Sequence, residues 1–326
     1  MGDVVVMTDF GSTEGSTAHL AHAVHLLTGR APAVVDARRF YTGGTGHAAL
    51  IGAPPALEIR YEGRRLRPEV IVVYEIPPQD RLRFARFQAL IARSGTVCLG
   101  ADATAWRRAT DKRRTVIRFR ETGVPHMESV LLQPYSPHVA EAFDRLGRDV
   151  WARPAVGFGG RGVVHITDER QLRAAAQRYA ATGAPWLLSR DAGNFDEHGR
   201  RHQYRVVVLG DRVLRVCEHV QSDPDAPCNE AQGAISRTLP SEALPARLRA
   251  LAVRATRALG LPFGGVDLVP ERGGVVFEVN VHPVLDVPQG FRTVAVPFAR
   301  AHFSIRPNDA SAHRAQGRVS GACPEN

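Results

Sequence analysis

The chain has 326 residues, of which 44% are hydrophobic and 23% are charged, so we expect two or three globular domains and exclude disordered and fibrous architectures. Its net charge is +9, from 42 Lys and Arg against 33 Asp and Glu, but the basic residues are scattered along the sequence. This scatter disfavours a nucleic-acid-binding surface, which we keep as an alternative.

The first part of the chain predicts a small α/β domain over residues 1–103. Its predicted strands are the hydrophobic runs at 4–7, 33–35 and 70–74. One predicted helix follows a polar loop at 8–16, and a second helix spans 81–92. We expect the strands to form a small parallel sheet. The loop before the first helix either caps that helix or holds a substrate carboxylate with its amide groups.

The rest of the chain predicts a central subdomain at 104–185, a C-terminal subdomain at 186–303 and a loose polar tail at 304–326. The predicted helices lie at 110–122, 138–146, 168–182 and 241–259, and the predicted strand pairs lie around 150–164, 204–214 and 263–281. Alternation of strands and helices makes the fold class α/β.

Cysteine usage and the N-terminus bear on the compartment. Cys98, Cys217, Cys228 and Cys323 form no C-x-x-C pair and no metal-ligand spacing, so we expect a reducing environment. The N-terminus has no signal-peptide pattern, and no apolar run has the length of a membrane span. We therefore expect a cytoplasmic protein without a membrane partner.

The last predicted strand pair brings three oxygen-bearing side chains together. Glu278 and Asn280 are two residues apart on a strand and share a face, and hairpin pairing places Asp267 opposite them unless the register slips by one residue. Two carboxylates and one amide suit Mg²⁺, which completes its shell with water and nucleotide phosphates. The alternative is a solvated polar face, which the apolar run at 264–268 disfavours.

A glycine-rich loop lies between the two strands predicted around 150–164. Its glycines are Gly157, Gly159, Gly160 and Gly162, and Arg153 precedes them. Glycine lets backbone N–H groups approach a phosphate closely. Because the loop precedes a strand, it matches neither a P-loop nor a dinucleotide fingerprint. Alone it is compatible with a phosphate loop or with an ordinary hairpin turn.

Taken in chain order, these segments resemble the ATP-grasp superfamily, in particular its RimK-like branch, which includes ribosomal-protein glutamate ligases. The resemblance covers about residues 58–290 and rests on segments 61–64, 111–112, 152–164, 204–211, 229–233, 264–268 and 278–283. It implies an ATP-grasp fold, in which an N-terminal α/β domain precedes central and C-terminal subdomains that clamp ATP.

The resemblance also implies roles for individual residues. Lys112 and Arg153 correspond to two phosphate-binding lysines of the family, and Ser189 and Arg190 fall in its adenine hinge. The resemblance assigns Mg²⁺ to Asp267, Glu278 and Asn280. Arg205 corresponds to a residue near the transferred phosphoryl group. Asn229 and Gly233 match an Asn-x-x-x-Gly loop that closes over that group.

Three positions depart from the family. Arg153 replaces a lysine, and its planar guanidinium differs in shape from an ammonium group. The hinge at 188–191 reads Leu-Ser-Arg-Asp instead of carrying a Gln-Glu pair, and Pro227 and Cys228 stand where the RimK-like branch carries an arginine. These departures argue against copying the glutamate-ligase substrate.

The resemblance implies ATP-dependent amide formation between a carboxylate and an amine through an acyl phosphate. We expect small amino-acid-like substrates, as in the ligases of antibiotic and other specialised-metabolite pathways, with a cyclo-ligase of the D-cycloserine type as one case. The alternatives are a glutamate ligase acting on a protein or peptide, a non-catalytic ATP-binding protein and a basic nucleic-acid-binding protein. A homodimer is left open.

Overall fold

The computed structural model describes residues 3–285 and 290–305, which form two compact units. Unit 2 is Arg107–Pro283, and unit 1 holds the described residues on either side of it. The sequence placed residues up to 303 in the C-terminal subdomain, whereas the last described helix belongs to unit 1. Most of the predicted tail, from residue 306 on, lies outside the described residues.

Unit 1 contains the predicted parallel sheet, in the order β2-β1-β6. Its strands are β1 (Asp3–Thr8), β2 (Ala33–Asp36) and β6 (Pro68–Val73). Its helices are α1 (Ser16–Thr28), α2 (Arg81–Arg93) and α8 (Val296–Ser304), and α3 (Ala103–Thr110) starts in it. Two short turns, η1 (Ala37–Phe40) and η5 (Phe291–Ala295), complete it. Helix α8 packs against α1 and β6 and buries Phe298 and Ala299.

Unit 1 also contains an antiparallel sheet that the sequence analysis did not predict. Its strands are β3 (His47–Ile51), β4 (Ala56–Tyr61) and β5 (Arg64–Leu66), in the order β3-β4-β5. Strand β3 begins with histidine and two alanines, which carry little strand propensity. Pairing of His47 through Ile51 with β4 decides its conformation instead.

The loop before α1 has an internal partner. The carboxylate of Glu75 accepts hydrogen bonds from the Ser16 amide at 3.0 Å and from the Ser12 hydroxyl at 2.7 Å. A carboxylate at a helix N-terminus is stabilised by the helix dipole. Of the two readings for this loop, the capped loop therefore fits the contacts that are present.

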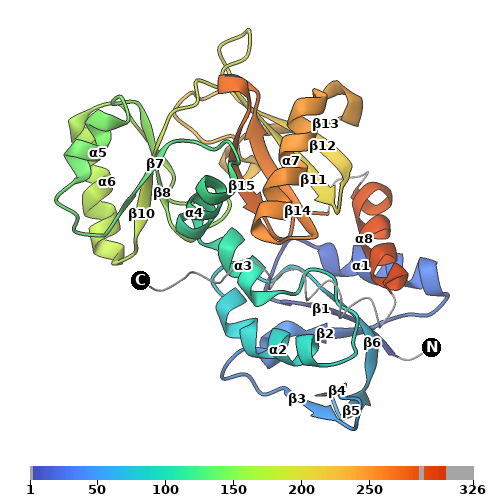
Figure 1. Ribbon diagram of the computed structural model, residues 1–326. Coiled ribbons are helices and arrows are strands. Elements are labelled where there is room, and N and C mark those ends of the chain that lie inside the picture. The colour runs from blue at the N-terminus through green and yellow to red at the C-terminus, as the bar shows by residue number, and fades with distance from the viewer. Residues whose placement is uncertain (1–2, 286–289, 306–326) are drawn as a thin grey trace, which may run out of the picture. The chain divides into compact units, whose positions relative to one another are not determined.

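The first sheet of unit 2 has the order β7-β10-β8-β9 and is antiparallel. Its strands are β7 (Ser129–Leu132), β8 (Val150–Pro154), β9 (Val164–Ile166) and β10 (Trp186–Arg190). Helices α5 (Val139–Arg145) and α6 (Glu169–Thr182) cover it, as Figure 1 shows in green. Asp168 and Gln171 form a capping box at the start of α6. The predicted hairpin is confirmed, since Ala152 pairs with Val164.

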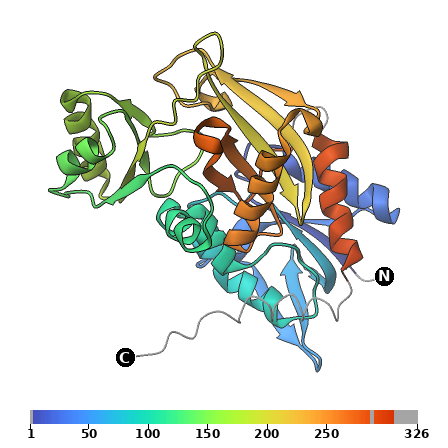
Figure 2. The same cartoon turned by 45° about the horizontal axis from the view of Figure 1, so that its top comes forward.

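The second sheet of unit 2 has five strands in the order β13-β12-β11-β14-β15. They are β11 (Arg201–Leu209), β12 (Arg212–Gln221), β13 (Ile235–Leu239), β14 (Phe263–Val269) and β15 (Val275–Asn280), with the short turns η2 (Glu230–Gln232), η3 (Ser241–Ala243) and η4 (Glu271–Gly273). Helix α7 (Ala246–Leu259) packs on one face with α4 (Lys112–Thr122) beside it (Figures 1 and 2). The opposite face carries polar side chains.

Two details explain this packing. A Cβ on Gly264 would lie 3.2 Å from the Asn280 carbonyl oxygen and from Val279 Cγ1, which is tighter than most side chains accept, so a glycine at this position suits the close pairing of β14 with β15. Helix α7 was predicted to start at Ser241 but starts at Ala246. Pro245 explains the difference, because the residue before a proline is pushed out of helical geometry. No helix among the described residues is long and apolar enough to cross a membrane.

Candidate functional site

A pocket of about 140 Å³ lies in unit 2, where both sheets contribute to its walls. Nine of the predicted residues line it: Lys112, Arg153, Gly157, Gly160, Ser189, Arg190, Asn229, Asp267 and Glu278. The other five, which are not part of the lining, are Gly159, Gly162, Arg205, Gly233 and Asn280. Gly159 and Gly162 are next to lining residues in the sequence, and Arg205 and Asn280 donate hydrogen bonds to Asp267. Gly233 ends the short turn that Asn229 begins.

Lys112 is the first residue of α4 and is buried in the pocket wall. Asp111 caps the helix with its side chain, and the Lys112 amide donates a hydrogen bond to the Ala155 carbonyl at 2.9 Å. The Lys112 Nζ lies 3.3 Å from Glu278 Oε2 and donates to the Gly157 carbonyl at 3.2 Å. One ammonium group thus joins α4, the glycine loop and β15.

Arg153 projects from β8 towards β15. Its Nη1 donates to the Phe277 carbonyl at 3.2 Å, and its buried Nε has no hydrogen-bond partner among the described residues. Burial lowers the pKa of Arg153, partly offset by Glu278. A buried donor without a partner is costly, so a ligand oxygen in the pocket would stabilise this guanidinium.

Asp267 and Arg205 form a buried bidentate ion pair across β14 and β11. Strand pairing places Arg205 opposite Asp267, and the Arg205 Nε and Nη2 donate to the two carboxylate oxygens at 2.7 and 2.8 Å. Burial lowers the pKa of Arg205, but the carboxylate of Asp267 outweighs that effect and raises it. Asn280 adds a donor to Asp267 Oδ2 at 3.2 Å.

The predicted metal ligands lie together on adjacent strands. The register pairs Asp267 with Glu278 and Gly265 with Asn280, so the predicted pairing is confirmed. A β-bulge between Asp267 and Leu268 shifts the register by one residue and so brings Asp267 opposite Glu278. Burial raises the pKa of Glu278, but Lys112, Arg153 and Arg205 outweigh it and hold that pKa below its ordinary value of 4.5. Asp267 Oδ1 accepts one hydrogen bond, from Arg205, and Glu278 Oε2 meets the Lys112 ammonium group, so each oxygen keeps a second lone pair and the donor set fits Mg²⁺.

The glycine loop and the Asn229–Gly233 loop contact each other. A Cβ on Gly160 would meet Gln232 at 2.9 Å, Pro227 at 3.2 Å and Asn229 at 3.6 Å. Gln232 Nε2 also donates to the Gly159 carbonyl at 3.2 Å. The two segments that the sequence assigned to the phosphates and to the reacting group therefore border one pocket.

The hinge side chains have partners at the start of β7 and just before it. Ser189 Oγ lies 2.8 Å from Ser129 Oγ, and Arg190 Nη2 lies 2.9 Å from Glu128 Oε2. The Ser189 hydroxyl and the Arg190 guanidinium therefore already bind other side chains of the protein. Any nucleotide contact at Ser189 and Arg190 would then involve other atoms of the two residues.

The sequence did not single out Trp151, Arg201 or Gln203, which also line the pocket. Arg201 Nη1 lies 2.7 Å from Asp191 Oδ2, and its guanidinium stacks on Trp151 with 4.9 Å to the ring centroid. The signal that could have found two of them is strand alternation, because Arg201 and Gln203 share a face with Arg205.

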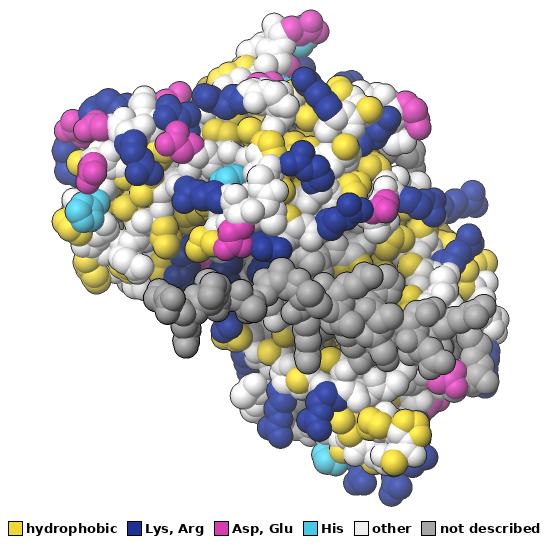
Figure 3. Space-filling view, viewed as in Figure 1, with side chains coloured by type: hydrophobic (Ala, Val, Ile, Leu, Met, Phe, Trp, Pro, Cys, Tyr) yellow, Lys and Arg dark blue, Asp and Glu magenta, His cyan; other side chains and the backbone are white. Residues whose placement is uncertain are grey.

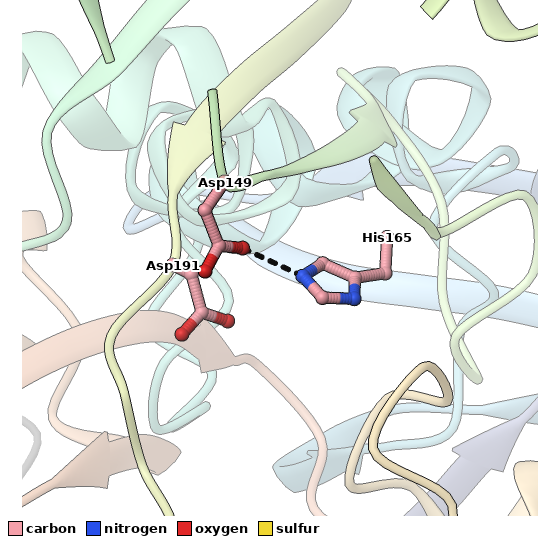
Figure 4. Close-up of side chains that lie close together, drawn as sticks. All are labelled: Asp149, His165 and Asp191. Carbon is pink, nitrogen blue, oxygen red and sulfur yellow. Dashed lines mark hydrogen bonds and ion pairs between the residues drawn. The ribbon is translucent and has the colours of Figure 1, made fainter. Parts of the chain in front are cut away.

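A second group of ligand-type side chains lies in unit 2. Asp149, His165 and Asp191 have side-chain donor atoms within 4.8 Å of one another (Figure 4). His165 Nε2 lies 2.7 Å from Asp149, and its Nδ1 lies 2.7 Å from Asp225. Arg201 pairs with Asp191, so the side chains of this group already have partners in the protein.

Positive charge is dispersed on one face of the molecule. On the face that Figure 3 shows, Lys and Arg side chains are spread over the surface, with Asp and Glu between some of them. A continuous basic face would be the expected footprint of nucleic-acid binding. This face therefore offers no support for that alternative.

Comparison with known proteins gives matches over the same region. The RimK-like ATP-grasp domain family matches residues 159–296. A probable alpha-L-glutamate ligase from Haemophilus influenzae (strain PittEE) is 27% identical over 200 residues, 59% of this chain and 62% of that protein. The probable alpha-L-glutamate ligase from Sodalis glossinidius is 26% identical over 236 residues, 71% and 76% of the two chains. The match to the Haemophilus protein thus spans less than two thirds of its length.

Solved structures share the fold over nearly the whole chain. The ATP-grasp ligase PsnB, complexed with a minimal precursor, has a TM-score of 0.66 at 18% identity and covers 93% of this chain and 98% of its own. The D-cycloserine synthetase DcsG has a TM-score of 0.63 at 20% identity, covering 96% and 100%. The chain therefore has the ATP-grasp fold, and its residues 159–296 match the RimK-like ATP-grasp domain family.

Proposed function

We propose that the protein is an ATP-dependent carboxylate–amine ligase that forms an amide and releases ADP and phosphate. One observation carries this proposal: Lys112 and Arg153 lie in the same pocket as the carboxylates of Asp267 and Glu278, under a glycine loop. Cations and carboxylates in one pocket suit a nucleotide phosphate with its metal ion, and they have no such use in a purely structural core.

The proposed reaction has a physical rationale. A carboxylate is a poor electrophile, and transfer of the γ-phosphoryl group of ATP turns it into an acyl phosphate. Lys112, Arg153 and Arg205 would bind and orient the phosphates and the carboxylate, because positioning and charge neutralisation account for most of the acceleration in phosphoryl transfer. Backbone amides near Gly233 would stabilise the oxyanion that forms when an amine attacks.

Asp267, Glu278 and Asn280 would hold Mg²⁺, which when bound neutralises phosphate charge. Lys112 leaves Glu278 as a phosphate enters, since its ammonium group can exchange one anionic partner for another. Arg205 orients the Asp267 carboxylate through the bidentate pair. These ligand assignments and the roles of Arg205, Asn229 and Gly233 are part of the proposal.

For the substrates, we favour small amino-acid-like acids and amines, with a cyclo-ligase of the D-cycloserine type in antibiotic biosynthesis as one case. The likeness to DcsG over the whole chain and the departures from the family at 188–191 and at Pro227 and Cys228 support this choice. The second candidate is a glutamate ligase acting on a protein or peptide. The names of the relatives favour it, as does the precursor bound to PsnB.

An ADP-release assay tests the function. The protein is incubated with MgATP, hydroxylamine and a panel of amino acids that includes L-glutamate and D-alanine, and both ADP and hydroxamate are measured. ADP and hydroxamate in equal amounts support an acyl phosphate. A melting temperature raised by MgATP without any ADP would instead support a non-catalytic nucleotide-binding protein. Mass gain on an added peptide would favour the second candidate.

A further inference from the structure

A buried histidine of β12 faces the same side of the sheet as the pocket residues. His219 pairs with Gln203 of β11, which lines the pocket, and the next pair on that face joins Cys217 to Arg205. His219 is therefore a diagonal neighbour of Arg205, at a separation that long side chains or a small ligand can span. Arg205 in turn pairs with Asp267.

One nitrogen of His219 lacks a partner. The side chain is 3% exposed, and its Nδ1 lies 2.5 Å from the Ser236 hydroxyl on β13. Its Nε2 is buried without a hydrogen-bond partner among residues 3–285 and 290–305. A buried polar atom is normally hydrogen-bonded, so we expect a bound substrate to supply the hydrogen-bond partner of this nitrogen.

The surroundings keep His219 neutral. Burial lowers the pKa of His219 below 6.5, and Arg205 lowers it further. Asp267 of β14 and Glu230 of η2 act in the opposite direction, and Arg215 on β12 again lowers it. At neutral pH the ring therefore carries no charge. When Nδ1 donates to Ser236, the lone pair of Nε2 is available to accept a proton.

We propose that His219 is the general base that accepts the proton of the attacking amine, an inference that rests on the proposed ligase function. The amine nitrogen forms a bond to the carbonyl carbon of the acyl phosphate, and Nε2 takes up the proton that this nitrogen loses. The tetrahedral intermediate then expels inorganic phosphate as the carbon–oxygen bond to phosphorus breaks. The imidazolium returns its proton to solvent, so the cycle yields amide and phosphate.

His219→Asn tests the role of the base while retaining a polar atom near Ser236. The wild type and the variant are compared with MgATP, amino acids of the panel as acid and amine, and hydroxylamine as an alternative nucleophile. Hydroxylamine is unprotonated at neutral pH and attacks acyl phosphates without a base. We expect amide formation to fall by about 10²- to 10⁴-fold, the usual contribution of general base catalysis, while hydroxamate formation stays near the wild-type rate.

Two readouts separate a base from a structural residue. In the wild type, kcat/KM for the amine falls when His219 is protonated, at a pH below 6.5, and the variant lacks this limb. Added imidazole should restore amide formation to His219→Ala, which leaves space for it. Should His219→Asn fold poorly, as shown by its melting temperature, His219→Gln provides the same comparison.

His202→Asn is the matched control. His202 lies on β11 and is buried, but strand alternation places it on the opposite face, where its Nε2 lies 3.0 Å from Glu271. We expect a loss of stability and no change in the ratio of amide to hydroxamate. Ser236→Ala should give a smaller loss of amide formation than His219→Asn, because Ser236 only positions the ring.

The outcomes distinguish the two proposals. Amide lost with hydroxamate retained and imidazole rescue supports the base. Amide formed at the wild-type rate by His219→Asn, or amide and hydroxamate lost equally, overturns the role of His219 and leaves the ligase in place. A wild-type protein that yields neither ADP nor hydroxamate with any acid of the panel overturns the ligase function, and the role of His219 falls with it.

Discussion

Two groups of carboxylates in unit 2 look alike in composition and differ in what surrounds them. Asp267 and Glu278 line a pocket, beside Lys112 and Arg153, which also line it. Asp149 and Asp191 meet His165 outside that lining, where His165 contacts Asp149 and Arg201 pairs with Asp191. Ligand-type atoms within reach of one another therefore do not define a metal site. A metal site also needs open space beside the carboxylates and neighbouring donors that can exchange partners.

The largest expected effect is at Glu278. In Glu278→Gln we expect ADP formation to fall by at least about 100-fold, because a bound metal contributes several kcal/mol of transition-state stabilisation and the amide removes a ligand charge. Circular dichroism and the melting temperature should show a folded protein. Turnover near the wild-type rate would remove Glu278 from the proposed metal site and break the comparison between the two groups.

Asp191→Asn should act on stability. Arg201 and Asp191 have side chains only 3% and 6% exposed, so the substitution leaves a buried charge with weaker partners and should lower the free energy of unfolding by about 3 kcal/mol. Urea denaturation measures this. Asp149→Asn is the control, since Asp149 is 57% exposed. Mg²⁺ that stabilises Glu278→Gln but not Asp191→Asn would reverse our assignment of the two groups.

Gly160→Ala should weaken nucleotide binding by about 10-fold. Gly160 has φ +68°, a backbone conformation that costs alanine about 1–2 kcal/mol. The alanine Cβ would also collide with Gln232. Gly159 is the matched control, because its φ is +64° but a Cβ there would meet nothing within 4 Å. Isothermal titration with ADP compares the variants. Equal losses would mean that contact between the two loops contributes nothing.

Acid pH sharpens the comparison through Glu278. Its folded-state pKa lies below 4.5, so its contribution to stability is fully present above pH 4.5 and is lost as the pH falls through the folded value. We expect the difference in melting temperature between wild type and Glu278→Gln to be constant above pH 4.5 and to shrink below it. A difference that already shrinks between pH 7 and 5 would show that the cations do not hold this carboxylate ionised.

The smallest effect is expected at Asp225. This residue reaches His165 from the loop after β12, but its side chain is 73% exposed. Exposed ion pairs contribute little, so Asp225→Asn should change the free energy of unfolding by no more than about 0.5 kcal/mol and leave ADP formation unchanged. A clear loss of turnover would mean that the second group of carboxylates belongs to the working site.

Local signals explain what could be predicted. Asp111 before Lys112, Asp168 with Gln171, and the glycines that end helices are read within one helical turn, so the bounds of α4 and α6 were near those observed. Strand alternation likewise placed Asp267 opposite Glu278, because a hairpin pairs residues that are close in sequence. The sheet β3-β4-β5 was missed because β3 begins with residues of weak strand propensity. The late start of α7 was missed because Pro245 interrupts the helical spacing of the apolar residues.

The sequence by itself determined the strand and helix pattern of unit 2, the carboxylates of β14 and β15 and the glycine loop, because each depends on neighbouring residues. Only the tertiary structure decided which groups meet over long separations. It paired Arg205 with Asp267, placed Gln232 against the glycine loop, brought His219 beside Gln203 and returned α8 to unit 1. Such contacts follow from packing and sheet order, which a local pattern does not encode.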